Sequence, residues 1–336
     1  MNIIPNLFDI ATSELSQDAF ITWLIKWSDE SLMSEDRNLH ETAKDLVLSI
    51  LKCGKIKVPQ SISKINAGRQ WGNIDIWIDI DEKYFVVIED KKDACQHGKQ
   101  LEKYKKFVHD HFKKSREIVL IYFKTGNESL STIQNIQENG WYYFNRKDFL
   151  NVLRQSNSDN NILLEFRRYL EKIEENTLSF HDSKNLDNGK ATEGLYLWLQ
   201  NELEDWSDWN YVSNPNGGFL GFWYNFVPCS DNAKRELYLQ IENYVGNKIN
   251  LYIRICGEWN KTTNYLYKVY DLIKEKSKGK EIEITKPSRF KPGAYSSIAM
   301  IKNVFKTDQN GKLDLSFLMK SLKISEKIIE EVAKEI

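Results

Sequence analysis

Two carboxylates and a lysine stand close together in one short stretch of the chain, between Gly72 and Lys91. Asp75 lies in a run that alternates apolar and polar residues, and Glu89 and Lys91 end a second, almost unbroken apolar run. Two carboxylates can hold a divalent cation that activates water, and a neighbouring ammonium group can orient that water or offset charge on a phosphate. These residue types indicate metal-dependent chemistry on a phosphate, and Mg²⁺ favours such a ligand set.

The two runs predict a β-hairpin that brings these side chains together. Residues 73–80 alternate with isoleucines on one face, and residues 84–88 are rich in Val, Ile and aromatic residues, as in a central strand. The two-residue period of a strand places Glu89 and Lys91 on the same face. We therefore expect Asp75 to lie beside them across the hairpin.

The order of these residues resembles that of the PD-(D/E)XK nuclease superfamily, in the prokaryotic branch that has an acidic first helix and a QLxxY helix after the lysine. The resemblance rests on Asp75, on the triplet Glu89-Asp90-Lys91 and on the segment Gln100-Leu101-Glu102-Lys103-Tyr104. It covers about the first half of the chain. Ile74 stands where the name of the superfamily has proline, at a position that varies widely.

The resemblance implies an α/β fold with a restriction-endonuclease-like αβββαβ core and a mixed sheet. It also implies hydrolysis of phosphodiester bonds with Mg²⁺, for which Mn²⁺ is expected to substitute. By the same likeness, the metal ligands are the carboxylates of Asp75 and Glu89 and the main-chain carbonyl of Asp90, and Lys91 completes the reacting centre. DNA is the expected substrate, with RNA left open, and defence against foreign DNA is the role that the resemblance suggests.

Two helices are expected to carry accessory residues of this site. The resemblance gives that role to Glu14, in a helix from Thr12 or Ser13 to about residue 27, and to Gln100, in a helix over residues 95–114. The positive end of the first helix alone would also favour a carboxylate at Glu14. Asp18 shares a helix face with Glu14, so either carboxylate could approach the metal. Lysines on the second helix either contact phosphates or form a solvated surface.

Other segments complete the expected architecture. We predict a helix over residues 40–51, a strand or extended segment over 56–65, strands at 117–124 and 141–144, and one helix from about 146 to 174. The polar stretch 179–190 predicts a boundary between a nuclease-like domain, residues 1–178, and a second domain, residues 191–336.

The second domain is predicted to be α+β, with strands near residues 219–227, 237–245 and 249–255 and with terminal helices. Its many aromatic residues could stack nucleobases, although such residues on a sheet that faces a helix are more often core. Arg289 and Lys291 lie in a small basic loop that could contact a phosphate. Whether this domain recognises substrate, a partner protein or a small ligand stays open, as does pairing of two chains into a homodimer.

Composition restricts the class of protein. The chain has 336 residues, which suits two domains, and its net charge of −1 means that any nucleic-acid surface must be local. It has no apolar run long enough to cross a bilayer and no signal-peptide pattern, so we expect a soluble, cytoplasmic protein without membrane partners. Four cysteines without CxxC spacing and five histidines without HxxxH spacing argue against a zinc site or a disulfide framework.

Two alternatives to a constitutive nuclease remain. One is a non-cleaving module that binds nucleic acid or protein on a nuclease fold, and loss of Asp75, Glu89 or Lys91 would have been its signature. The other is a nuclease effector that a ligand bound to the second domain switches on.

Overall fold

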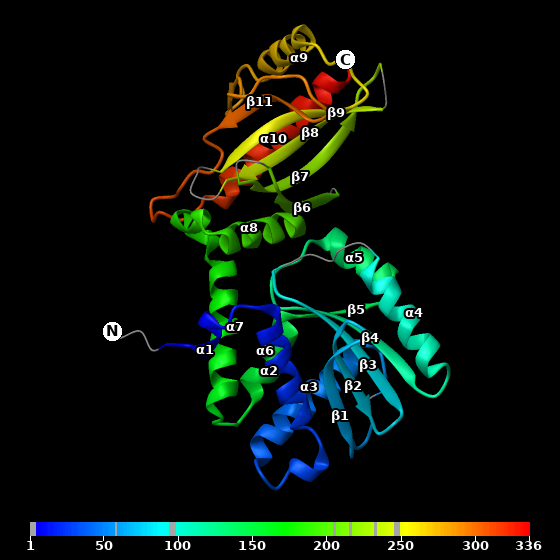
Figure 1. Ribbon diagram of the computed structural model, residues 1–336. Coiled ribbons are helices and arrows are strands. Elements are labelled where there is room, and N and C mark those ends of the chain that lie inside the picture. The colour runs from blue at the N-terminus through cyan, green and yellow to red at the C-terminus, as the bar shows by residue number, and fades with distance from the viewer. Residues whose placement is uncertain are drawn as a thin grey trace. The chain divides into compact units, whose positions relative to one another are not determined.

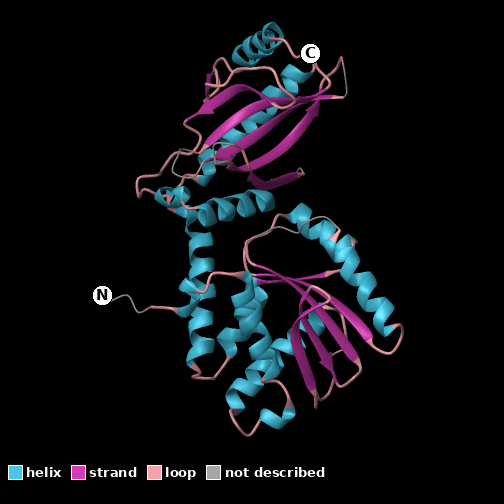
Figure 2. Cartoon of the chain, viewed as in Figure 1, coloured by secondary structure: helices cyan, strands magenta, loops and turns pink. Residues whose placement is uncertain are grey.

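The computed structural model describes residues 5–57, 59–93, 99–203, 206–214, 217–231, 234–244 and 249–336. The chain divides into two compact units, residues 1–175 and 176–336, and the division falls within helix α7 (Asn161–Leu178). Each unit contains a β-sheet with helices packed against it (Figures 1 and 2).

The N-terminal unit is built on a five-stranded mixed sheet with strand order β1-β2-β3-β4-β5. The first three strands are antiparallel neighbours, and β3, β4 and β5 run parallel. The strands are β1 (Ile65–Trp71), β2 (Ile74–Ile80), β3 (Tyr84–Lys91), β4 (Glu117–Lys124) and β5 (Tyr142–Asn145). Parallel strands need crossover connections, and helices supply them here. The crossover helices are α4 (Gln100–Phe112) and α5 (Leu130–Glu138).

Helices cover both faces of this sheet, so that it separates two apolar cores. Val86 and Ile88 of β3 pack into one core, and Phe85 and Val87 pack into the other, on the side of α4. The helices on the first side are α1 (Leu7–Ile10), α2 (Glu14–Lys26), α3 (Arg37–Cys53), α6 (Arg146–Gln155) and α7. This succession of a helix, three antiparallel strands, a helix and a parallel strand confirms the predicted αβββαβ core with a mixed sheet.

Of the two alternatives predicted for residues 56–65, a strand or an extended approach to β1, the strand is wrong, because β1 begins only at Ile65. The preceding amides are held by a side chain instead of a neighbouring strand. The carboxylate of Asp81 accepts hydrogen bonds from the main-chain N–H groups of Ser63 and Lys64. These side-chain contacts occupy the two amides directly before β1.

One predicted helix also needs correction. The helix expected over residues 146–174 is interrupted, because Ser156 has an extended backbone and Asn160 accepts hydrogen bonds from the first amides of α7. Helix α5, whose N-cap is Ser129, was not predicted. The N-cap of α2 is Ser13, one of the two residues, Thr12 and Ser13, predicted to begin this helix. The helix predicted over residues 95–114 is α4, and its proposed start at 95–98 lies outside the described residues.

The C-terminal unit is α+β, as expected, with a six-stranded antiparallel sheet in the order β10-β11-β9-β8-β7-β6. The strands are β6 (Ser207–Val212), β7 (Phe219–Pro228), β8 (Arg235–Asn243), β9 (Asn250–Gly257), β10 (Glu283–Thr285) and β11 (Ser296–Lys302). The helices that share a core with one face of the sheet are α8 (Gly189–Glu202), α9 (Thr263–Lys276) and α10 (Leu315–Ala333). The sequence prediction missed β6 and β11.

The stretch predicted as a domain boundary is not an extended linker. It contains two short 3₁₀ helices, η2 (Ser179–His181) and η3 (Ser183–Asp187), and a third, η1 (Glu30–Leu32), lies between α2 and α3. Phe180 and Leu186 are buried in the C-terminal core. These two apolar side chains attach the polar stretch to the second unit.

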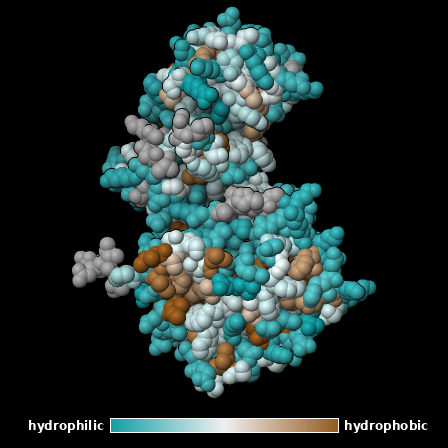
Figure 3. Space-filling model, viewed as in Figure 1, coloured by the Kyte–Doolittle hydropathy of each residue, from teal (hydrophilic) through white to brown (hydrophobic). Residues whose placement is uncertain are grey.

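None of the helices in the described ranges combines the length and apolarity that a bilayer crossing requires. Figure 3 shows a largely hydrophilic surface on the C-terminal unit and a group of apolar residues on the N-terminal unit. Exposed apolar side chains in that unit include Leu7, Ile10 and Leu15.

Candidate active site

The hairpin of β2 and β3 places the two predicted carboxylates opposite each other. Ile76 pairs with Ile88, so the preceding Asp75 comes opposite Glu89. The side chain of Glu89 follows those of Phe85 and Val87 on the face of the sheet that α4 covers. The site therefore forms where β3 ends, next to the end of the parallel strand β4, the usual edge for a site in an α/β sheet.

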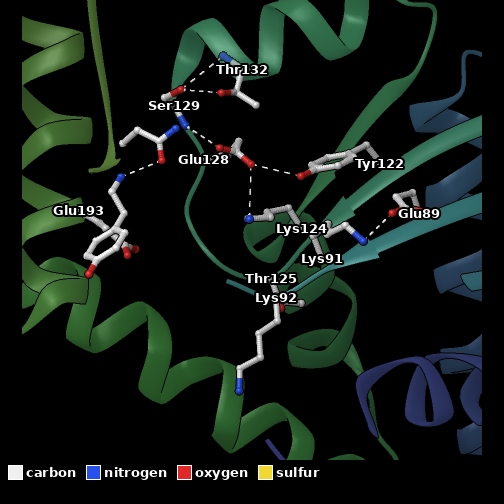
Figure 4. Close-up of polar contacts among 12 residues, drawn as sticks. Glu89, Lys91, Lys92, Tyr122, Lys124, Thr125, Glu128, Ser129, Thr132 and Glu193 are labelled. Carbon is white, nitrogen blue, oxygen red and sulfur yellow. Dashed lines mark hydrogen bonds and ion pairs between the residues drawn. The ribbon is translucent and has the colours of Figure 1, made fainter. Parts of the chain in front are cut away.

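The ammonium group of Lys91 contacts every oxygen group that the resemblance assigns to the metal. Its Nζ lies 2.5 Å from Oε1 of Glu89, 3.2 Å from the main-chain oxygen of Asp90 and 3.7 Å from Oδ2 of Asp75. Glu89 is fully buried and Lys91 is 7% exposed. Figure 4 shows the ion pair between these two side chains. The structure thus brings together the four residues that the sequence analysis placed at the centre of the site.

The electrostatics of this cluster require a positive charge. Burial, and then the charge of Asp75, raise the pKa of Glu89 to about 8, although Lys91 acts in the opposite direction. Burial alone would lower the pKa of Lys91, but Glu89, Asp75 and Glu14 outweigh burial and raise it. Lys91 is therefore charged at neutral pH and lies beside both carboxyl groups, of which Glu89 can also hold a proton at that pH.

The donor atoms fit a hard divalent cation. Oε2 of Glu89 is buried and has no hydrogen-bond donor among the residues that the structure describes. Such an acceptor favours a metal ion or a proton. Within the same residues no three His, Cys, Asp or Glu side chains converge as a metal cage. Two carboxylates and a carbonyl suit Mg²⁺, which keeps several water ligands and seldom takes an all-protein cage.

The side chain of Asp90 points to the opposite face of the sheet, where a buried network fixes it. Its carboxylate accepts two hydrogen bonds from Nε2 of Gln17, at 2.7 and 2.9 Å, and Oε1 of Gln17 accepts one from Thr125. Asp18 lies beside it, and burial with the nearby Asp18 charge raises the pKa of Asp90 well above its usual range. The main-chain N–H of Asp90 donates to Oδ2 of Asp75 over 3.1 Å. Asp90, a residue of β3, is therefore connected both to β2, through Asp75, and to α2, through Gln17.

The network continues to the helices that follow the sheet. The guanidinium group of Arg146, at the start of α6, donates to the carbonyl oxygen of Thr125 and to Asn127. It also forms a buried ion pair with Glu174 of α7, at 2.7 Å. Arg146 thus ties the loop after β4 to two helices and keeps Thr125 in reach of Gln17.

The two accessory residues have different positions. Glu14 accepts a hydrogen bond from the main-chain N–H of Lys92, at 3.0 Å, and therefore holds the backbone directly after Lys91. Gln100 donates to the hydroxyl of Tyr104, which donates to the carbonyl of Asn73. The contacts of Gln100 thus lead to the start of β2 rather than to the carboxylates.

Another buried ion pair lies beside the site. Lys124 is the partner of Lys91 in the parallel ladder, and its Nζ lies 3.4 Å from Oε2 of Glu128. The hydroxyl of Tyr122 donates to the same carboxylate, as Figure 4 shows. Asp79, an acidic residue of the same hairpin, pairs with Arg116 at 3.3 Å.

Sequence reasoning missed Gln17, Thr125, Arg146 and the pair of Lys124 with Glu128. A signal existed for Gln17, because residues 14, 17 and 18 recur at the spacing of one helix face and all are polar within an apolar helix. Thr125 and Arg146 carry no local signal, since their partners are distant in sequence, whereas Lys124 and Glu128 are only four residues apart.

The fold and the site define a restriction-endonuclease-like α/β domain with a two-carboxylate, one-lysine centre. A comparison with protein families matches residues 5–186 to the PD-(D/E)XK nuclease superfamily, and the chain belongs to that superfamily. Its members are generally nucleases and typically use divalent metals. Neither the curated proteins nor the solved structures that we compared contain a match to the chain.

Proposed function

We propose that this protein is a Mg²⁺-dependent nuclease that hydrolyses phosphodiester bonds in DNA, with Mn²⁺ as an alternative cation. The observation that carries the proposal is the convergence of Asp75, Glu89 and the Asp90 carbonyl on one buried ammonium group. Membership of the superfamily supports nucleic acid as the substrate.

In the proposed mechanism, Asp75, Glu89 and the carbonyl of Asp90 would hold the cation, which when bound would supply Lewis acidity and an activated water. Lys91 moves its ammonium group from Glu89 toward the water and the phosphate, where it orients the nucleophile and offsets developing charge. The Asp90 N–H fixes the orientation of Asp75. Gln17 fixes Asp90 in turn, so the ligands are in place before substrate arrives.

The surface of α4 supports a phosphate-contacting role. This helix covers the face that carries the site, and its buried side is formed by Leu101, Tyr104 and Val108. Exposed lysines follow its length, at Lys99, Lys103 and Lys106. Such charges bind nucleic-acid backbones without reading sequence. A local basic surface of this kind can contact the backbone even though the chain as a whole has almost no net charge.

The test is cleavage of supercoiled plasmid and of a single-stranded RNA by the purified chain, each with Mg²⁺, Mn²⁺ or EDTA. We expect metal-dependent cutting of the plasmid, and Glu89→Gln should slow it by at least about a hundredfold. Glu82→Gln is the matched control, because it makes the same change at an exposed position of the same hairpin.

Each alternative result has a defined meaning. If the chain cuts RNA but not the plasmid, its substrate is RNA and not DNA. Binding of either nucleic acid without cutting, in the presence of both metals, would favour the non-cleaving module. Equal activity of Glu89→Gln and the wild type would remove the proposed site.

The proposal extends to defence against foreign DNA, which the likeness to the prokaryotic branch supports. Cells that express the wild-type chain should plate bacteriophage less efficiently than cells that express Glu89→Gln. Equal plating across a panel of phages with both proteins would contradict this role without affecting the enzymatic proposal.

A further inference from the structure

The C-terminal unit contains a cavity of about 730 Å³ on one face of its sheet. Leu237, Leu239 and Ile241 of β8 point into the core that the helices share. Their neighbours Gln240 and Glu242 point the other way and line the cavity. The cavity therefore lies on the sheet face opposite the helical core, and its volume is typical of sites for small organic ligands.

Aromatic side chains from several strands form much of its wall. Trp223 and Phe226 come from β7, Tyr238 from β8 and Tyr252 from β9. Tyr238 and Phe226 stack in parallel, with 4.7 Å between ring centroids. Trp223 and Tyr252 are partly exposed. Because the helices of the core lie on the other face, the partly exposed rings of Trp223 and Tyr252 are available to a flat ligand.

The floor of the cavity is polar and has one unused donor. Glu242 accepts hydrogen bonds from Gln240, at 2.9 Å, from Tyr244, at 3.1 Å, and from Arg254, at 2.9 Å. Arg254 also donates to the carbonyl oxygen of Tyr295 in the loop above. Its Nε is buried and makes no hydrogen bond within the described parts of the chain. The guanidinium group is thus held at the cavity by Glu242 and by the carbonyl of Tyr295.

The charges of the lining favour an anion. Glu242 and Arg254 neutralise each other across the floor. Arg289 and Lys291, on the loop between β10 and β11, line the cavity and are exposed. The lining thus carries a net charge of +2, within a chain of net charge −1. The ligand that matches it combines an aromatic ring with a negative group.

We propose that this cavity binds a nucleotide, with the base against the aromatic wall near Trp223 and the phosphate at Arg289 and Lys291. Stacking accepts every base, and the two basic side chains accept a phosphate. The nucleotide is either a free molecule or part of a single strand, since both present the same chemistry. The inference does not depend on the proposed nuclease activity.

The test is equilibrium binding to the full-length chain in EDTA, which keeps metal-dependent hydrolysis out of the measurement. The probes are ATP, GTP, CTP and UTP, inorganic phosphate, and a short oligothymidylate. We expect saturable binding of at least one triphosphate or of the oligonucleotide at one site per chain, and much weaker binding of phosphate alone. Triphosphate binding would identify a free nucleotide as the ligand, and binding of the oligonucleotide only would identify a strand.

Variants connect binding to the cavity. Trp223→Ala should weaken binding at least about tenfold, from the loss of one stacked base. The double variant Arg289→Ala/Lys291→Ala should do the same, and its exposed positions leave folding intact. The control is Lys274→Ala/Lys278→Ala, which removes two exposed charges of the same unit outside the cavity. Binding of none of the probes, or equal affinity in both test variants and the wild type, would overturn the proposal.

Discussion

Replacing Lys91 with methionine separates the two roles that its ammonium group has in this site. The group is the counterion of Glu89, and it also occupies the oxygen atoms proposed to hold the cation. Methionine retains most of the aliphatic chain and removes only the charge. We expect Lys91→Met to lose cleavage and yet to bind the divalent cation at least as tightly as the wild type, because the competing charge is gone.

The size of the effect on stability follows from burial. Removing one partner of a buried ion pair costs roughly 3–5 kcal/mol when the other charge stays. Burial and Asp75 already raise the pKa of Glu89 to about 8, so this carboxyl group can take up a proton near neutral pH. The metal-free variant should therefore lose only about 2 kcal/mol. That loss corresponds to a fall of roughly 4–8 °C in melting temperature for a domain of this size.

Saturating Mg²⁺ should restore most of this loss, since a ligand at a hundred times its Kd stabilises the folded state by about 2.7 kcal/mol. The assay is thermal unfolding of both proteins at pH 8, with EDTA or with Mg²⁺, alongside plasmid cleavage. Lys83→Met, at an exposed position of the same hairpin, is the control. A variant that is as stable as the wild type in EDTA and no longer responds to Mg²⁺ would refute this account of Lys91.

Three further predictions concern the residues around the site. Gln17→Ala should leave KM nearly unchanged and lower kcat about tenfold, because the Asp90 carboxylate loses its two hydrogen bonds. Steady-state kinetics measures both constants, and an unchanged kcat would contradict this prediction. Lys124→Leu should cost about 3 kcal/mol in denaturant unfolding, and adding Glu128→Leu should recover more than half, whereas additive losses would mean that the pair is not coupled. Burial raises the pKa of Asp18 from 3.8 to about 6, so in EDTA the folded chain holds this proton more tightly than the unfolded chain. The stability of the fold should therefore fall as pH rises from about 4 to 6. Melting curves of Asp18→Asn over this pH range should show a smaller fall.

Local patterns in the sequence were sufficient for the centre of the site. The two-residue period of β3 placed Glu89 and Lys91 on one face. The short turn between β2 and β3 fixed the register of the hairpin, and this register places Asp75 opposite Glu89. Apolar runs also identified β4 and the main strands of the second sheet. These features depend on residues that are near in sequence, so the pattern of apolar and polar side chains is sufficient to predict them.

Local sequence patterns could not predict interactions between segments that are distant in the chain. The carboxylate of Asp90 is held by Gln17, 73 residues earlier, and the amides before β1 are held by Asp81, in the turn between β2 and β3. The break between α6 and α7 required recognition of Asn160 as a cap within a polar stretch. The aromatic cavity needed the register of several strands, which decided that Trp223 faces away from the helical core.

The most direct test of the account is to locate the bound cation itself. Fe²⁺ in place of Mg²⁺, with ascorbate and peroxide, generates radicals that cut the backbone next to the metal. We expect cuts beside Asp75 and between Glu89 and Lys91, suppressed by excess Mg²⁺ and absent in Glu89→Gln. Cuts elsewhere in the chain, or the same cuts in the variant, would contradict a cation held by Asp75, Glu89 and the carbonyl of Asp90.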